Sequence, residues 1–332
     1  MNYESNKHLV RFADLEYARA AFIDARIPGS HLKENYCIVG AGVSQDSRQP
    51  VHIRETDGFH LGAAGQPPGI LNSLHSHRTA EIFMVYKGTF RIYWGPEGEH
   101  EALLGPGDMI TVPIHCFRGF EVVGIESGFM FVVLGGDDCG GGVIFHPTIL
   151  SEGQKYGLYL KKDKTLADTV IGDPVPEASE LFPPLTAEEV AEFDNYSVEE
   201  MMKYVSLKAD RTPRESAFTA SGTFDCYHVS GHPDHDDDFE VKSNDGVSIY
   251  SYEIPEGGYV PMHRRSENQV LVNLSGDVRL TFSDPELMPI LLGPGDTYDL
   301  PKALGVELEG VRETGYVYCI VHGDDVSAPV VL

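Results

Sequence analysis

The hydrophobic positions of this chain fall in short runs that are apolar throughout or alternate with polar residues. Glycine or proline bounds most of these runs, and they are rich in β-branched and aromatic residues, which favours strands. The runs cover residues 82–86, 89–94, 109–113 and 128–134 in the first half, and 247–254, 270–274, 278–282 and 316–321 in the second. Short strands separated by turn residues predict a small antiparallel β-barrel in each half.

The two halves also repeat each other when the chain is shifted by 188 residues. The shift places Gly69 on Gly257, His75 on His263 and Gly88 on Gly276, and it places the run LLGPGD at 103–108 on an identical run at 291–296. Agreement of turn residues in both order and spacing indicates two copies of one module.

Helical signals are confined to two places. Thr186 and Ser197 each begin a capping-box pattern with glutamate three residues later, which predicts a helical connector near residues 186–206. Residues 14–25 have helical periodicity and predict a helix that packs against a barrel. We therefore expect an N-terminal extension with a helix (1–48), a first barrel (49–150), a linker with helices (151–236) and a second barrel (237–332).

Composition narrows the functional class. The chain has 332 residues and a formal net charge of −26, and this acidic surface argues against nucleic acid as a partner. Its five cysteines are scattered without C-x-x-C spacing, which favours a reducing cytoplasm over a disulfide framework. No signal-peptide pattern and no apolar run of membrane-spanning length is visible, so we expect a cytoplasmic protein without membrane contact.

One group of residues in the first half has reactive side chains: His75, His77 and Glu81, which lie between Gly69 and Gly88 in the sequence. Histidines two residues apart on a strand point to the same side, and Glu81 opens the next predicted strand. Two imidazoles and one carboxylate inside a barrel predict a divalent transition-metal site with open positions. The alternative is two ordinary histidines beside a surface glutamate.

These residues resemble the first signature motif of the cupin superfamily, and two copies resemble a bicupin. The resemblance implies an all-β fold of two tandem cupin (double-stranded β-helix or jelly-roll) barrels with short helical connectors. The second motif of the family ends in a histidine that is the fourth metal ligand. Counted from Gly107 and Pro113, that position holds Arg118, and His115 stands where the family has glycine. Either a remodelled turn brings His115 to the metal, or the site has three protein ligands and Arg118 anchors the substrate.

The second copy has His263, Arg265 and Gln269 where the first has its three candidate ligands. One imidazole beside a permanent cation binds a divalent metal poorly, so we expect a degenerate second site and one metal ion per chain. The second barrel is then a structural and dimerisation partner, or alternatively a site for an acidic metabolite.

The resemblance also suggests a reaction. Among bicupins, dioxygenases of the quercetinase and gentisate dioxygenase type bind a phenolic or enolic substrate at the metal beside O2. On that analogy Glu81 and Arg118 are catalytic, and Phe83, Val85 and Arg118 line the substrate pocket. The alternatives are a non-oxidative cupin metalloenzyme (isomerase, lyase or decarboxylase) and a non-catalytic small-molecule-binding bicupin. Imidazole and carboxylate suit Fe, Mn, Ni, Co, Cu and Zn alike, and a homodimer is expected.

Overall fold

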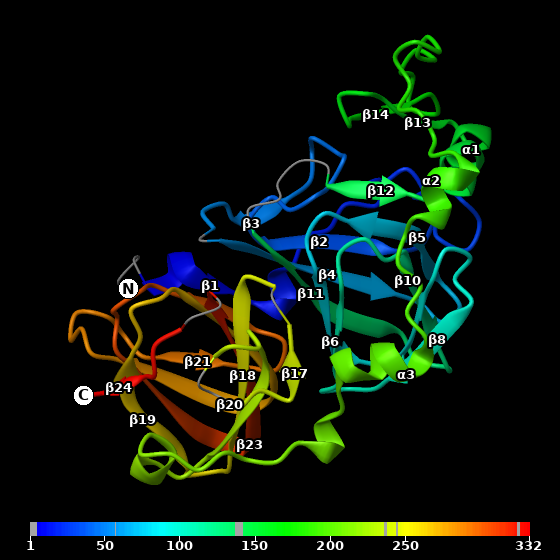
Figure 1. Ribbon diagram of the computed structural model, residues 1–332. Helices are drawn as coiled ribbons and strands as arrows, with labels where there is room; N and C mark the ends of the chain where they lie inside the picture. Colours follow the sequence, from blue (N-terminus) through cyan, green and yellow to red (C-terminus); the bar gives the residue numbers. More distant parts are fainter. Residues whose placement is uncertain (1–4, 57, 137–141, 236–237, 244, 324–325) are drawn as a thin grey trace. The chain divides into compact units, whose positions relative to one another are not determined.

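The computed structural model describes residues 5–56, 58–136, 142–235, 238–243, 245–323 and 326–332. The chain divides into two compact units. The N-terminal barrel consists of Glu16–Arg54 and His60–Val205, and the C-terminal barrel consists of Met1–Leu15, Glu55–Phe59 and Ser206–Leu332. Strands dominate both units, as predicted (Figure 1). The units differ from the four expected ranges because residues 1–15 group with the C-terminal barrel and residues 151–205 with the N-terminal one.

The N-terminal barrel is built from two sheets whose strands pair mostly antiparallel. One sheet has five strands in the order β12-β5-β10-β7-β8, and the other has seven in the order β15-β9-β6-β11-β4-β2-β3. The strands are β2 Glu34–Val39, β3 Val51–Ile53, β4 Phe59–Gln66, β5 Leu71–His77, β6 Glu81–Lys87, β7 Thr89–Trp94, β8 His100–Leu104, β9 Met109–Val112, β10 Arg118–Val123, β11 Gly128–Gly135, β12 Val143–Phe145 and β15 Val205–Ser206. A separate hairpin pairs β13 Leu158–Leu160 with β14 Leu166–Asp168.

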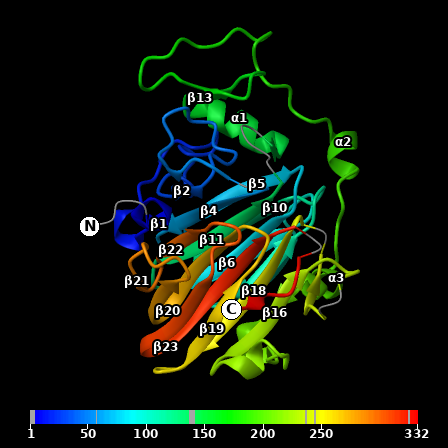
Figure 2. The same ribbon diagram turned by 90° about the vertical axis from the view of Figure 1, so that its left-hand side faces the viewer.

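The C-terminal barrel is one sheet of ten strands, which curls around a core of aliphatic and aromatic side chains. Its strands are β1 Leu9–Val10, β16 Asp225–Gly231, β17 Val241–Lys242, β18 Val247–Ile254, β19 Tyr259–Arg264, β20 Gln269–Phe282, β21 Ile290–Leu292, β22 Thr297–Leu300, β23 Val306–His322 and β24 Val330–Val331. Figure 2 shows the long strands β20 and β23 lying side by side. The strands expected at 270–274 and 278–282 are one strand here, because β20 stays paired with β23 through a series of register shifts around Gly276.

The start of the chain completes the C-terminal barrel. Strand β1 pairs with β22, and the Arg11 guanidinium donates to Asp296 and to the Leu291 carbonyl, each at 2.6 Å. Asp296 ends the second LLGPGD run and accepts from the Gly293 amide at 2.9 Å. Its counterpart Asp108 accepts from Gly105 at 2.8 Å, so the repeated sequence makes the same turn in both barrels.

The helices are few and short: α1 Pro147–Lys155, α2 Ala187–Ala191, α3 Val198–Met201, and the 3₁₀ turns η1 Ser5–His8, η2 Phe12–Asp14, η3 Met202–Tyr204, η4 Lys208–Asp210 and η5 Thr219–Ser221. Both predicted capping boxes are present, at Thr186 with Glu189 and at Ser197 with Glu200. None of the helices in the described part of the chain is long and apolar enough to span a membrane. Four cysteines, Cys37, Cys116, Cys226 and Cys319, are buried free thiols, and Cys139 lies outside the described residues.

The helix predicted over residues 14–25 is wrong. Only η2 overlaps it, and the rest is a chain of turns. Tertiary contacts override the periodicity here: Ala18 pairs with Asn35 as an isolated bridge, and the Ile23 amide donates to the Gln45 side chain. Asp24 is buried and accepts from Lys33 and from the Ser73 amide. Only an irregular backbone allows these residues to form their hydrogen bonds.

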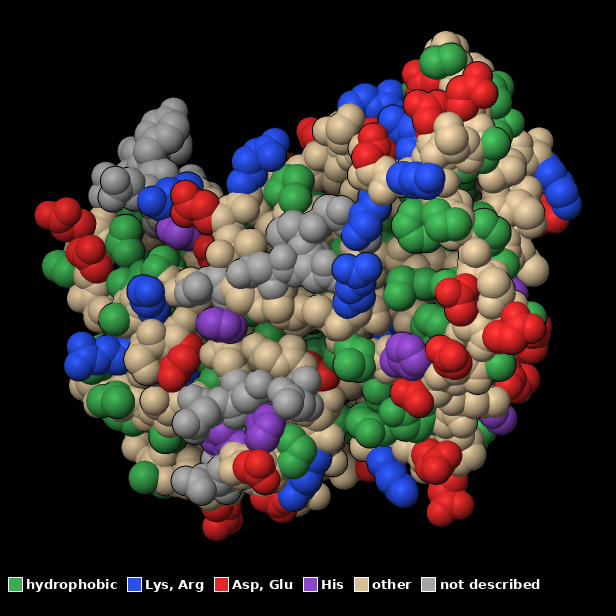
Figure 3. Space-filling view, turned by 45° about the horizontal axis from the view of Figure 1, so that its top comes forward, with side chains coloured by type: hydrophobic (Ala, Val, Ile, Leu, Met, Phe, Trp, Pro, Cys, Tyr) green, Lys and Arg blue, Asp and Glu red, His purple; other side chains and the backbone are tan. Residues whose placement is uncertain are grey.

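Acidic and basic side chains are interspersed on the face drawn in Figure 3, where the described Lys and Arg form no continuous basic surface. The sequence-wide excess of 51 Asp and Glu over 25 Lys and Arg accounts for this pattern. Such a face offers phosphate groups little electrostatic attraction.

Two motif glycines give a matched test of the fold. Gly69 and Gly88 have φ of +75° and +77°. A Cβ at Gly69 would meet open space, whereas a Cβ at Gly88 would lie 2.8 Å from the Gly128 Cα. We expect Gly69→Ala to cost about 1 kcal/mol of unfolding free energy and Gly88→Ala about 3 kcal/mol, because only the second adds a backbone clash to the left-handed conformation.

Denaturant unfolding followed by the fluorescence of Trp94, the one tryptophan and a buried residue of this barrel, measures both costs. Equal costs for the two variants would show that the close approach of Gly88 to Gly128 is not needed.

Candidate metal centre

Two strands of the N-terminal barrel bring the candidate ligands together. His75 and His77 lie on β5 in the five-stranded sheet, and Glu81 opens β6 in the seven-stranded sheet. The two histidines share one side of β5 because side chains alternate along a strand. All three side chains are buried, so the carboxylate meets the imidazoles in the space between the two sheets.

The geometry suits a single metal ion. His75 Nε2 lies 3.5 Å from Glu81 Oε2, and His77 Nε2 lies 3.5 Å from Glu81 Oε1. The donor atoms of the three residues lie within 4.8 Å of one another. His75 Nδ1 donates to the Ser73 carbonyl at 2.8 Å, and since a carbonyl only accepts, the Nε2 lone pair is left for the metal. The predicted constellation is thus assembled, and the donor set fits a divalent transition metal.

The electrostatics favour the protonation state that metal binding needs. Burial by itself would raise the pKa of Glu81, but His77 and His75 hold it well below its usual range. Burial lowers the pKa of His77 despite the nearby carboxylate. A carboxylate and an unprotonated His77 imidazole are therefore ready at neutral pH, and no proton needs to leave these two groups when a metal binds.

Arg118 occupies the register position expected for a fourth ligand. It lies directly opposite His75 where β10 pairs with β5, and its side chain is completely buried. Its Nε lies 3.5 Å from Glu81 Oε2, and its Nη2 donates to the Val112 and Pro113 carbonyls at 3.2 and 3.0 Å. The guanidinium therefore neutralises Glu81 from behind. It is not among the described residues that line the cavity, so the expected role in the substrate pocket is not supported.

His115 does not join the cluster. It has a left-handed backbone with φ of 60° in the exposed turn after Pro113. Its ring stacks on Phe193 with centroids 4.5 Å apart, and its carbonyl accepts from the Asp194 amide. Of the two alternatives for the second motif, this stacking favours a site without His115, which is not among the residues whose donor atoms cluster with Glu81.

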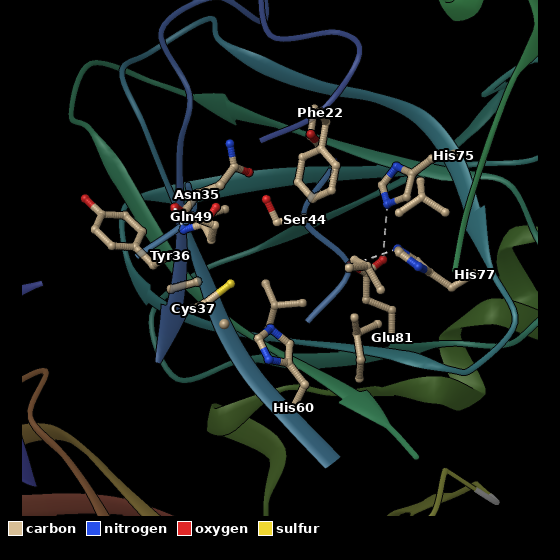
Figure 4. Close-up of a pocket in the computed structure, with 18 of the residues that line it drawn as sticks. Phe22, Asn35, Tyr36, Cys37, Ser44, Gln49, His60, His75, His77 and Glu81 are labelled. Atoms are coloured by element: carbon tan, nitrogen blue, oxygen red, sulfur yellow. Dashed lines mark hydrogen bonds and ion pairs between the residues drawn. The ribbon is translucent and has the colours of Figure 1, made fainter. Parts of the chain in front are cut away.

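A cavity opens beside the cluster, with about 70 Å³ available to the centres of water molecules. Figure 4 shows the ligands at one end and Asn35, Tyr36 and Gln49 at the other. Phe83 and Val85, expected to line it, are fully buried and are not among the lining residues described. Phe83 packs edge-on against Phe120, and Phe120 lines the cavity. The predicted pocket residues therefore lie behind the cavity wall and not in it.

The sequence analysis did not predict most of the residues that line the cavity. These residues come from the turns before β2, from the residues around β2 and from β4. His60 on β4 is one of these groups, and burial lowers its pKa to about 4. Gly42 and Gly62 pack on its ring, since a Cβ at either would lie 2.5 or 2.8 Å from the imidazole Nε2. No pattern in the sequence singles out this histidine.

The irregular segment that replaced the predicted helix holds the ligand strand. Lys33 and Asp24 form a buried ion pair, and Lys33 also donates to Asn72 at 2.6 Å. Asp24 accepts from the Ser73 amide at 3.1 Å, and the Ser73 carbonyl accepts from His75. Lys33, Asp24 and Ser73 thus orient the His75 imidazole.

In the C-terminal barrel the equivalent residues His263, Arg265 and Gln269 are also buried. Among the described residues, the cluster of His75, His77 and Glu81 is the only group of three or more His, Cys, Asp or Glu side chains close enough to bind one metal ion. One metal ion per chain remains our prediction.

Metal content tests the ligand assignment. We expect about one ion per chain in the native protein and at least about a 100-fold loss of affinity in His77→Gln or Glu81→Gln, because each removes a direct ligand. His115→Ala is the matched control and should keep its metal. Elemental analysis after exhaustive dialysis measures the content, and two ions per chain, or metal loss in His115→Ala, would contradict the assignment.

His60 predicts a pH dependence of stability. Its folded pKa of about 4 lies below the ordinary 6.5, so between these values the unfolded chain binds a proton that the folded chain does not. Stability should therefore fall on acidification from pH 6.5 to 4, by roughly 3 kcal/mol from this group. Denaturant titrations of metal-free His60→Gln should show a shallower slope in this window, whereas the exposed-residue control His31→Gln should match the native protein.

Comparisons with known proteins agree on the fold. No family model matches the chain, and no curated protein matches it in sequence. Oxalate decarboxylase from Bacillus subtilis is similar in structure with a TM-score of 0.59, at 15% identity over 98% of this chain and 78% of that one. A structure of oxalate decarboxylase that concerns its substrate binding mode gives 0.60 at 16% identity, covering 98% and 79% of the two chains. Vicilin from Corylus avellana (hazelnut) gives 0.55 at 13% identity, covering 96% and 86%. The chain therefore has the all-β bicupin fold of two tandem barrels.

Proposed function

We propose that the N-terminal barrel is a metal-dependent, non-oxidative lyase that removes a carboxyl group from a small carboxylic acid. The observation that carries the proposal is the buried cluster of His75, His77 and Glu81 at the end of a small cavity. Similarity to structures of oxalate decarboxylase supports the choice among reactions that such a centre can perform. The dioxygenase expected from the sequence finds no support among the similar structures, although the fold alone permits many activities.

The cavity favours a small substrate with two polar ends. About 70 Å³ is open to the centres of water-sized groups, which suits a molecule of few atoms. At the end away from the cluster, Gln49 Nε2 donates to the Asn35 and Pro50 carbonyls, which fixes the amide so that Oε1 is the unpartnered atom among the described groups. Asn35 Nδ2 is likewise unpartnered and buried. A dicarboxylic or hydroxycarboxylic acid of few carbon atoms would place one end at the metal and the other against these amides.

The residues present divide the chemistry between them. His75, His77 and Glu81 would hold a divalent metal, which supplies a Lewis acid for the substrate carboxylate. Arg118 Nε lies 3.5 Å from Glu81 Oε2 and offsets the negative charge of the carboxylate, and it is not among the described residues that line the cavity. Phe22, Phe120 and Phe145 form apolar walls that exclude water and strengthen electrostatic interactions inside.

His60 is the candidate proton donor and acceptor. It lines the same cavity as the ligands, and its Nδ1 has no hydrogen-bond partner among the described residues. Burial keeps the imidazole unprotonated at neutral pH. It can therefore accept a proton from an acidic substrate and return it at Nδ1 to the carbon that loses its carboxyl group.

Product analysis tests this function. Protein loaded separately with Mn, Fe, Co, Ni or Zn is incubated with oxalate, malonate, oxaloacetate and short hydroxy acids, and CO2 release and oxygen uptake are recorded together. We expect CO2 release without net oxygen consumption, a loss of at least about 100-fold in kcat for Glu81→Gln, and a lower kcat at full metal content for His60→Gln. His115→Ala should keep the native rate.

Net oxygen uptake with a flavonol, a dihydroxybenzoate or a diketone would favour the dioxygenase instead. Absence of turnover with every acid by fully metal-loaded protein would contradict the lyase.

A further inference from the structure

Among the described residues, the core of the C-terminal barrel contains a cation without a counter-ion. Four cationic side chains are buried among the described residues: Lys33, Arg118, Arg211 and Arg265. The first three each lie within 4.0 Å of a carboxylate, belonging to Asp24, Glu81 and Glu240 respectively. No described carboxylate lies that close to Arg265. A buried charge costs several kcal/mol unless it is compensated, so this guanidinium requires an explanation.

The contacts of Arg265 use only part of the guanidinium. Nη1 donates to the Ser327 carbonyl, and the planar group lies over the Tyr250 ring with its central carbon 4.6 Å from the centroid. Its Nε has no hydrogen-bond partner among the described residues. These contacts orient the side chain and leave its charge without a carboxylate and its Nε without a hydrogen-bond partner among the described residues.

Further donors surround this group. Cys319 Sγ donates to Gln269 Oε1 at 3.3 Å, which fixes the amide so that Nε2 is the unpartnered end. The Tyr252 hydroxyl is buried and has no partner with hydrogen-bond geometry among the described groups. Burial and Cys319 raise the pKa of Tyr252 while Arg265 opposes the rise, which places the guanidinium within electrostatic reach of the phenol.

The remaining polar group adds no charge. His263, the counterpart of His75, donates from Nδ1 to the Pro261 carbonyl at 2.8 Å, and burial lowers its pKa to about 4. The site therefore carries one positive charge at neutral pH, from Arg265, with N–H and O–H donors around it. Such a set complements a monovalent anion and repels a metal ion.

We propose that the C-terminal barrel binds one small monovalent anion, a short carboxylate or a halide, at Arg265, Gln269 and Tyr252. At the positions where the first copy has its candidate metal ligands, this copy would then have an anion site. The proposal is independent of the function of the N-terminal barrel, because it rests on different residues in the other compact unit.

Calorimetric titration of the full chain tests the proposal. The protein is freed of metal with a chelator, so that the N-terminal centre cannot hold an anion through a metal. Sodium formate, acetate and chloride are titrated separately at constant ionic strength, which is maintained with a bulky sulfonate. We expect saturable binding of one anion per chain, and the order of affinities distinguishes a carboxylate site from a halide site.

Matched variants locate the binding. Arg265→Gln should weaken it by about tenfold or more, because it removes the charge that the anion neutralises. Arg264→Gln removes the same charge from the adjacent, exposed residue and should bind like the native protein. Gln269→Glu supplies an internal carboxylate beside Arg265, so it should abolish anion binding and raise the Tm measured without added anion.

Gln269→Glu tests the proposal even if Arg265→Gln fails to fold. A native protein that binds none of the three anions would overturn the proposal. Native-like binding in both Arg265→Gln and Gln269→Glu would also overturn it.

Discussion

A carboxylate is stable inside a β-barrel only if its negative charge is compensated. Because Glu81 is buried, this requirement applies in the N-terminal barrel. Two imidazoles face the carboxylate on one side, and the Arg118 guanidinium lies behind it. Arg118 stands where the related motif has a fourth ligand, so a permanent cation replaces a neutral donor. A metal ion held by His75, His77 and Glu81 would have three protein ligands, which would leave coordination positions for a substrate.

The same constraint is met differently in the C-terminal barrel. Gln269 replaces the carboxylate and Arg265 replaces an imidazole, so this interior has a buried cation without a paired carboxylate among the described residues, while the strands and the LLGPGD turn are retained. The two barrels are thus one scaffold with different electrostatic content. A module whose fold rests on apolar strands and turn glycines can exchange its interior polar groups without losing its architecture.

Sequence reasoning succeeded where the signal is local. Strand alternation placed His75 and His77 on one side, and motif counting placed Arg118 opposite the ligands, because both depend only on short-range periodicity. It failed at residues 14–25, where the buried partners of Asp24 lie on β5 and at Lys33 and dictate turns. It could not find His60 or Gln49, because side chains distant along the chain meet in the cavity only after the sheets close.

The central claim is that this chain has one metal centre, formed by three residues of the N-terminal barrel. Anomalous X-ray diffraction from crystals of the cobalt- or manganese-loaded protein tests it most directly. The predicted result is a single strong peak per chain, within about 2.0–2.3 Å of His75 Nε2, His77 Nε2 and a Glu81 carboxylate oxygen. A peak beside His263, a peak in both barrels, or coordination by His115 would contradict it.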